Sequence, residues 1–334
     1  MATQFSEIGK SKALEKLFTD SGYSNENGFI LKNEGASSAI VQKLFLENVD
    51  FDLTYNPMRH LGYKLALNLI GELYAKLARP VSLQTIIGIS NRFSFEDIQE
   101  IWEGILAASK KHNVSHLSLD LNPSAAGLAI AMSATGNIGQ AANEGRPEPA
   151  SGDLILLSGN VGAAYMGLNV LEREKAAFNK VAPGLEAPQP DLSKYEYIVG
   201  QYLSPELNPG IIDRFDEAGK YPSTGYFVTR GLGDAVKQIS AATRLGVKIY
   251  VDKVPIASKT FEMAEELNID PITSAINGGD DYRLVYVVSI KDYELFRKDF
   301  QDYDIIGHLA QKDVGCVLVT PEGTEIEIKA QGYN

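Results

Sequence analysis

Cysteine is almost absent from this sequence of 334 residues. Cys316 is its single cysteine, so no internal disulfide can form, and the neighbouring Val317–Val319 predict that it lies in a buried strand. Long apolar runs are also missing, because no stretch of about 18 apolar residues occurs and Met1–Lys10 has no apolar signal-peptide core. The sequence therefore predicts a chain without a membrane span, in a reducing, cytoplasmic setting.

Basic residues are fewer than acidic ones, with 31 Lys and Arg against 43 Asp and Glu and a net charge of −12. A general nucleic-acid surface needs clustered Lys and Arg to meet the phosphate backbone, so this composition disfavours one. It leaves room for a small anionic ligand at a local basic site. Zinc is disfavoured too, because no pair at zinc-ligand spacing is formed by the four histidines, His60, His112, His116 and His308.

Hydrophobic residues make up 44% of the chain, which is enough for a substantial core. After Pro57 a leucine recurs at every fourth position, which predicts a core helix with the stripe Leu61, Leu65, Leu69, Leu73 and Leu77. Strand and helix patterns mix throughout, and turn formers and charged residues replace them between Gly136 and Gly152. We predict an α+β chain of two domains, 1–145 and 150–334.

Two glycines and two carboxylates stand directly before the apolar run Leu284–Val288, which predicts a buried strand. Gly278 and Gly279 permit backbone angles that other residues resist, so a tight turn would hold Asp280 and Asp281 at the mouth of this strand. Carboxylates placed there can bind a cation or a polar substrate, or one can act as a general base. A solvated turn rich in Asp is the alternative.

A second glycine-rich turn joins an expected strand over 153–158 to a helix predicted over Leu168–Phe178. Gly159 and Gly162 in this turn can present backbone N–H groups to a phosphate. The turn has neither the G-x-G-x-x-G spacing nor the Lys-Ser/Thr of a P-loop. Close packing of strand against helix explains the glycines equally well.

In the order of its segments the chain resembles thiamine-monophosphate kinase, a family of the aminoimidazole ribonucleotide synthetase superfamily. The matching segments are 49–53, 60–64, 159–168, 172–175, 231–232, 276–282 and 331–334. The resemblance implies a two-domain synthetase-like α+β fold, in which strands of an ATP-side N-terminal domain join across a homodimer and the C-terminal domain binds substrate. It also implies that ATP donates a phosphoryl group to thiamine monophosphate, with several Mg²⁺ ions held by aspartates.

The chain departs from this family at the metal-binding acids. Asp120 matches a family aspartate, and Asp280-Asp281 stands where the family has Glu-Asp. Six other aspartate positions carry different residues here, so six carboxylates are replaced by two cations and four uncharged residues, and their formal charge changes from −6 to +2. These positions are Ala36, Ser37, Lys43, Gly71, Phe227 and Arg230.

These substitutions bear on the metal directly. Mg²⁺ requires oxygen ligands in a near-octahedral array, and two like unit charges about 4 Å apart repel each other by roughly 4 kcal/mol at an effective dielectric of 20. We therefore expect Asp120 to hold one Mg²⁺ weakly and the site to fail to assemble the multi-metal ATP complex. Lys43 and Arg230 would instead face the phosphate of a ligand bound without metal. The alternative is that both are solvated or pair with nearby acids.

Three functions are compatible with these observations, and no residue is assigned as catalytic. The lost acids favour a non-catalytic member of the family that binds a phosphorylated ligand or acts as a dimer partner. The near full-length resemblance favours an active thiamine-monophosphate kinase with a rearranged metal site. An enzyme of changed chemistry would use Asp50 or Asp281 as a base. The expected substrate contacts are Asp280, Asp281, Tyr282 and, unless it only closes the core, Tyr333.

Overall fold

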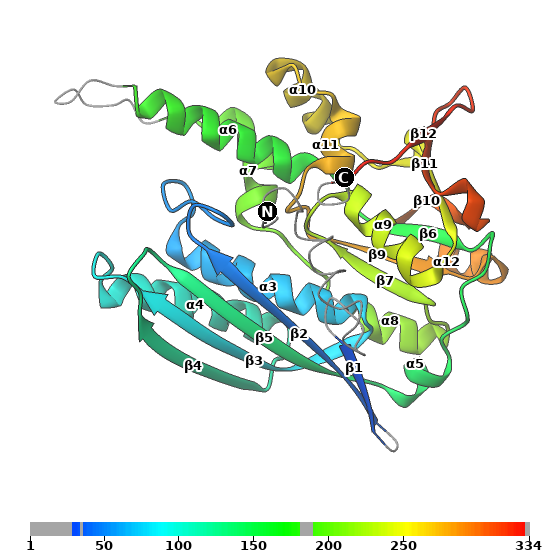
Figure 1. The fold of residues 1–334 in the computed structure, drawn as a ribbon, viewed down its shortest axis with the longest axis horizontal. Coiled ribbons are helices and arrows are strands. Elements are labelled where there is room, and N and C mark those ends of the chain that lie inside the picture. Colours follow the sequence, from blue (N-terminus) through cyan, green and yellow to red (C-terminus); the bar gives the residue numbers. More distant parts are fainter. Residues whose placement is uncertain (1–28, 34–35, 181–189, 331–334) are drawn as a thin grey trace, which may run out of the picture.

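The structure, a computed structural model, describes residues 29–33, 36–180 and 190–330. The predicted substrate contact Tyr333 lies outside these residues. So does Ser11–Thr19, where the helical spacing of Leu14, Leu17 and Phe18 predicts a helix. The described part of the chain builds two β-sheets with helices beside and between them (Figure 1). This mixture of strands and helices confirms the α+β class.

The first sheet has five strands in the order β1-β2-β5-β3-β4. All neighbours pair antiparallel except β3 and β4, which pair parallel. The strands are β1 (Phe29–Asn33), β2 (Ala36–Leu46), β3 (Ala78–Ile89), β4 (His116–Pro123) and β5 (Ala129–Ile138). One face is covered by α3 (Met58–Ala75) and α4 (Phe95–Lys111) (Figure 1). Ser94 and Asp97 form a capping box at the start of α4, as expected from a Ser followed three residues later by an acid.

The second sheet has seven strands in the order β12-β11-β8-β10-β6-β9-β7. They are β6 (Leu154–Ser158), β7 (Thr224–Val228), β8 (Gly246–Tyr250), β9 (Arg283–Val288), β10 (Tyr303–Ala310), β11 (Cys316–Val319) and β12 (Glu325–Glu327). The α-helices after β5 are α5 (Gln140–Glu144), α6 (Ala163–Phe178), α7 (Glu196–Leu203), α8 (Ile211–Ala218), α9 (Leu232–Thr243), α10 (Ser258–Leu267), α11 (Pro271–Asn277) and α12 (Tyr293–Asp299). Short 3₁₀ turns cover 193–195, 251–253, 290–292 and 312–314.

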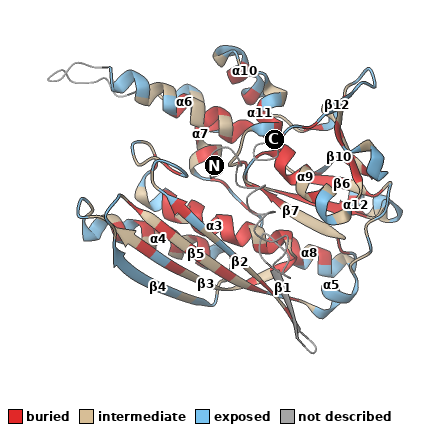
Figure 2. Ribbon diagram, viewed as in Figure 1, coloured by how far each residue is buried: buried red, intermediate tan, exposed pale blue. Residues whose placement is uncertain are grey.

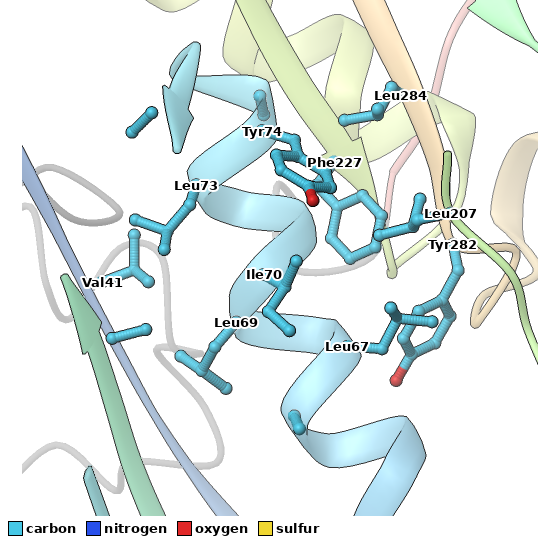
Figure 3. Packing of buried hydrophobic residues seen from close by; sticks show 14 of the residues in the cluster. Val41, Leu67, Leu69, Ile70, Leu73, Tyr74, Leu207, Phe227, Tyr282 and Leu284 are labelled. Carbon is cyan, nitrogen blue, oxygen red and sulfur yellow. The ribbon is translucent and has the colours of Figure 1, made fainter. Parts of the chain in front are cut away.

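Helix α3 is the central element of the molecule, because it contacts the first sheet on one side and β7 and β9 of the second on the other. The predicted leucine stripe is confirmed from Leu61 to Leu73, which are all buried. Leu77 is buried too, but it lies beyond the end of α3 at Ala75 and has φ +59°. Figure 3 shows Phe227 and Tyr282 beside this helix, across from Val41. The largest core cluster therefore contains residues from both sides of the predicted domain boundary. The division at 145–150 stays a prediction.

Two glycines set the position of α3 against α4. A Cβ at Gly62 would lie 1.9 Å from the carbonyl oxygen of Ile101, and one at Gly104 would lie 2.0 Å from that of Arg59. Since any side chain at these positions would collide with backbone, the two helices can touch only with glycine at both places. This close crossing fixes the helix from which Lys64 and Asn68 project.

The other face of the first sheet is not covered by a helix among the described residues (Figure 1). Leu44 is 57% exposed there and Ile86 is 48% exposed. The edge strand β4 is exposed along nearly its whole length (Figure 2). No helix in the described ranges combines the length and apolar character needed to span a bilayer.

Candidate functional site

A cavity of about 680 Å³ lies where β2, β3, β5 and α3 meet the segments after β7 and before β9. Five of the residues named in the sequence analysis line it, namely Lys43, Asp50, Arg230, Asp280 and Tyr282, together with Lys64 and Asn68. The structure thus brings the acidic turn together with both predicted cations. Asp120, Asp281, Gly159 and Gly162 are not among the lining residues.

The acidic turn has its unusual backbone angles on the site residues themselves. Asp280 has φ +58° and Tyr282 has φ +52°, a region that L residues rarely adopt. Gly278, where the sequence predicted this freedom, has φ −59° and is instead required because a Cβ would lie 2.2 Å from the carbonyl oxygen of Ser274. The backbone N–H of Tyr282 donates to the carbonyl of Val228, the last residue of β7, and that of Asp280 donates to the carbonyl of Thr229, which follows it; these bonds hold the turn. Such conformations cluster at functional sites.

Lys64 forms the central ion pair of the cavity, and our sequence analysis did not single it out. Its Nζ lies 2.8 Å from Oδ2 of Asp280 and 3.5 Å from the centre of the Tyr202 ring. Burial lowers the pKa of Lys64, whereas the Asp280 carboxylate raises it. The sequence did hold a signal for this site. Lys64 and Asn68 are four residues apart beside the leucine stripe, so they share one face of the helix and give it a polar patch.

Asp281 does not line the cavity and instead holds the glycine turn before α6. Its Oδ1 accepts a hydrogen bond of 2.8 Å from the backbone N–H of Gly162, and Oδ2 is buried without a partner among the described residues. Burial raises the pKa of Asp281 to about 7, although the Gly162 N–H opposes the shift. A phosphate at the glycine turn would compete with this carboxylate, so phosphate binding by Gly159 and Gly162 stays a prediction.

The two cations at former acid positions both have partners within the chain. Nζ of Lys43 donates to Oδ1 of Asn68 at 2.6 Å and lies 3.5 Å from Oγ1 of Thr229. Arg230 donates through Nη2 to Oδ1 of Asp234 at 2.8 Å and through Nε to Oδ2 at 3.2 Å. Pairing with a nearby acid, the alternative to phosphate contact, is therefore what Arg230 does here.

Glu72 adds a further carboxyl group to this region. Burial raises its pKa, and the charges of Lys43 and Arg230 oppose that shift, so the carboxyl group lies within their field. Sequence analysis missed Glu72 and Asp234. Glu72 directly follows Gly71, and Asp234 stands four residues after Arg230, so each is an acid close to a position from which an aspartate is missing.

The remaining altered positions carry no charge. Gly71 faces the ring of Phe227, because a Cβ there would lie 2.3 Å from Cζ of that ring. Ser37 is buried, and Ala36 is the first residue of β2. Strand β2, which contains Ala36, Ser37 and Lys43, therefore has no carboxylate, and position 71 has none either.

The two remaining acids of the sequence analysis lie apart from the ion pair. Asp120 sits on edge strand β4, where it accepts hydrogen bonds from the backbone N–H of Leu121 and from Nδ2 of Asn122. Asp50 lines the cavity, and its Oδ2 accepts the backbone N–H of Leu46 at 2.7 Å. Within the described ranges no cluster of three or more His, Cys, Asp or Glu side chains has a geometry that could hold a metal ion.

Comparison with known proteins places this geometry in context. No protein-family model matches the sequence. The thiamine-monophosphate kinase of Bacillus subtilis is 22% identical over 322 residues, covering 94% of this chain and 93% of the kinase. The solved structure of "AaThiL complexed with AMPPCP and TMP" superposes with a TM-score of 0.79 at 17% identity over 98% of both chains. The hydrogenase maturation protein HypE in complex with ATP has a TM-score of 0.62 at 14% identity, over 97% of this chain and 96% of HypE.

Proposed function

Because the chain belongs to the thiamine-monophosphate kinase family, we propose that it is a kinase-like protein whose cleft no longer assembles a magnesium–ATP complex. It would bind a small phosphorylated ligand without metal, or act as a dimer partner. The observation that carries this proposal is the Phe227 ring packed against Gly71, at two positions where the family pattern has aspartate. These residues do not fit a cluster of Mg²⁺ ions, which need oxygen ligands.

The cationic substitutions support the same proposal. An ammonium group at position 43 and a guanidinium group at position 230 repel a divalent cation where carboxylates would attract it. Phosphoryl transfer depends almost entirely on positioning the phosphates and neutralising their charge. We therefore assign ligand binding to the cavity, with Lys43, Asp280 and Tyr282 as contacts and Arg230 as a contact once it leaves Asp234.

An active thiamine-monophosphate kinase with a rearranged metal site is the second candidate. Glu72 and Asp234 favour it, because each places a carboxyl group beside a position from which an aspartate is missing. The AMPPCP- and TMP-bound neighbour of the same fold also favours it. In this arrangement Asp280 would have to exchange the ammonium group of Lys64 for a metal ion, and Arg230 would have to release Asp234.

A coupled ADP-release assay separates the two candidates. We expect the purified chain, given ATP, Mg²⁺ and thiamine monophosphate, to turn over about 10³-fold more slowly than the B. subtilis kinase assayed in parallel, because roughly 4 kcal/mol of lost charge stabilisation corresponds to that factor. Calorimetric titration of thiamine monophosphate in EDTA should give the same affinity as in Mg²⁺. Steady formation of thiamine diphosphate would instead establish the second candidate.

The uncovered face of the first sheet supports a homodimer. Leu44 and Ile86 are exposed on this face, with the small residue Ala131 between them in the β2-β5-β3 register, and an exposed apolar sheet face is typical of an interface. Leu44→Glu should convert the dimer to a monomer in sedimentation velocity. Phe261→Glu, at an exposed phenylalanine of α10, is the matched control and should leave the sedimentation coefficient unchanged.

A further inference from the structure

The glycine at position 71 and the ring of Phe227 form a complementary pair. Gly71 lies inside α3, where glycine is less favourable than alanine by about 1 kcal/mol. A Cβ at this position would lie 2.3, 2.4 and 2.5 Å from Cζ, Cε1 and Cε2 of Phe227. The ring is 6% exposed, so it fills the notch that the missing side chain leaves. Neither residue suits the site without the other.

The same ring is joined to Lys43 through two polar side chains. Phe227 packs edge-on against Tyr282 with ring centres 5.4 Å apart. The Tyr282 hydroxyl accepts a hydrogen bond from Nδ2 of Asn68 at 3.1 Å and donates to the carbonyl oxygen of Lys64 at 3.2 Å. This orientation leaves Oδ1 of Asn68 for the Lys43 ammonium at 2.6 Å. Ring, phenol, amide and ammonium are therefore one connected unit.

Strand geometry explains why the Lys43 ammonium belongs to this unit. Val41 and Phe45 stand two residues before and two residues after Lys43 on β2, and both are buried against α3. Because side chains two residues apart in a strand point to the same face, Lys43 faces α3 as well. An ammonium group taken into a packed region needs oxygen partners. It finds them in Asn68 of α3 and Thr229 of the segment after β7, with the Glu72 carboxyl group in its field.

We infer that Phe227 and Lys43 together take the place of a divalent cation in this chain, the ring by filling the volume beside Gly71 and the ammonium by supplying a positive charge held by oxygens. This inference rests on the proposed function and names what makes the cleft independent of metal. It assigns to Phe227 the role of excluding the cation, although the residue does not line the cavity. The ligand class it implies is one that binds without a divalent cation.

A double-mutant cycle with alanine tests the complementary pair in the metal-free protein. Gly71→Ala alone should lower Tm by about 5 °C, because the new Cβ overlaps the ring. In a Phe227→Ala background the same change should be neutral or raise Tm, since alanine is the better helix former. Phe227→Leu, which keeps part of the apolar volume, should give an intermediate cost. An equal cost of Gly71→Ala in all three backgrounds would overturn the inference.

Gly200 provides the matched control for this cycle. It also lies inside a helix, but a Cβ there would meet no atom within 4 Å. Gly200→Ala should leave Tm unchanged or raise it slightly, whether residue 227 is phenylalanine or alanine. A loss of Tm at Gly200 comparable to that at Gly71 would show that the cost does not come from the ring, and would also overturn the inference.

Mn²⁺ titration, read from the electron paramagnetic resonance of the free ion, tests the exclusion of metal. The triple variant Lys43→Asp, Gly71→Asp, Phe227→Asp should bind Mn²⁺ at least tenfold more tightly than the wild-type chain. Equal affinities in the two proteins would contradict the inference. A wild-type chain that forms ADP only with Mg²⁺ would remove both the inference and the proposed function. An inactive chain with no coupling between positions 71 and 227 would remove the inference alone.

Discussion

Asp280→Asn is expected to lower the free energy of unfolding by about 3 kcal/mol, because it leaves a buried lysine without its counter-charge. Lys64 is only 7% exposed at its side chain, whereas Asp280 is 32% exposed, which places the loss at the lower end for buried pairs. Asparagine keeps the shape of the side chain and tolerates the positive φ at this position. Urea denaturation at pH 7 measures the change.

The pH dependence identifies the cause of this loss. The folded-state pKa of Lys64 is already lowered by burial and falls further without Asp280, so the unfolded chain binds the proton more tightly. Stability of the variant should therefore rise with pH, between the lowered pKa of Lys64 and the ordinary lysine value of about 10.4.

Asp302→Asn is the matched control, because the Arg214–Asp302 pair has a similar distance of 2.7 Å but lies at the surface. It should cost less than about 1 kcal/mol. A loss at Asp280 no larger than this would contradict the buried pair.

Asp281 should make the protein less stable as the pH rises from about 4 to about 7. The pKa of Asp281 in the folded protein is raised to about 7, from an ordinary value of 3.8 in the unfolded chain. Its contribution to the free energy of unfolding is therefore fully present below pH 3.8 and is lost as the pH rises to about 7. At 1.36 kcal/mol per pKa unit the change amounts to about 4 kcal/mol as an upper value. Asp281→Asn, which keeps an oxygen for the Gly162 N–H, should lack this decline.

The measurement is the difference between the two unfolding curves over pH 4 to 8. Taking the difference removes the contribution of His112, whose pKa is lowered to about 4 by burial and whose effect on stability has the opposite sign. The charged groups that act on Asp281 are Arg283 and Asp280, and both are present in the variant as well. Parallel curves would show that the Asp281 carboxyl group is not buried as described.

Much of this fold follows from the sequence because its elements have strong local signals. The leucine stripe after Pro57 predicts α3, and the apolar run Leu284–Val288 predicts β9 with the acidic turn before it. Both segments match the family pattern as well. The domain boundary is harder to predict from composition, because the two halves share one core cluster and are not separated by a gap in packing.

The site was predictable in part. The altered acid positions identified Lys43 and Arg230, and the structure places both on the cavity with Asp280. Sequence reasoning did not find Lys64, because an ion pair between segments far apart in the chain, such as Lys64–Asp280, has no local pattern. It missed Asp234 although this acid stands only four residues after Arg230. It also could not see that Gly71 and Phe227 are partners, since 156 positions separate them and only packing brings them together.

The sharing of one core by both halves has a consequence for how the protein is made. During synthesis the first sheet and α3 leave the ribosome long before Phe215, Tyr286 and Phe296, which complete the same apolar cluster. Until those segments arrive, one side of α3 has nothing to pack against, and exposed apolar surface of this kind promotes aggregation of nascent chains. Chaperone demand should therefore be highest when about half of the polypeptide has been translated, and separately expressed halves should fail to reassemble efficiently.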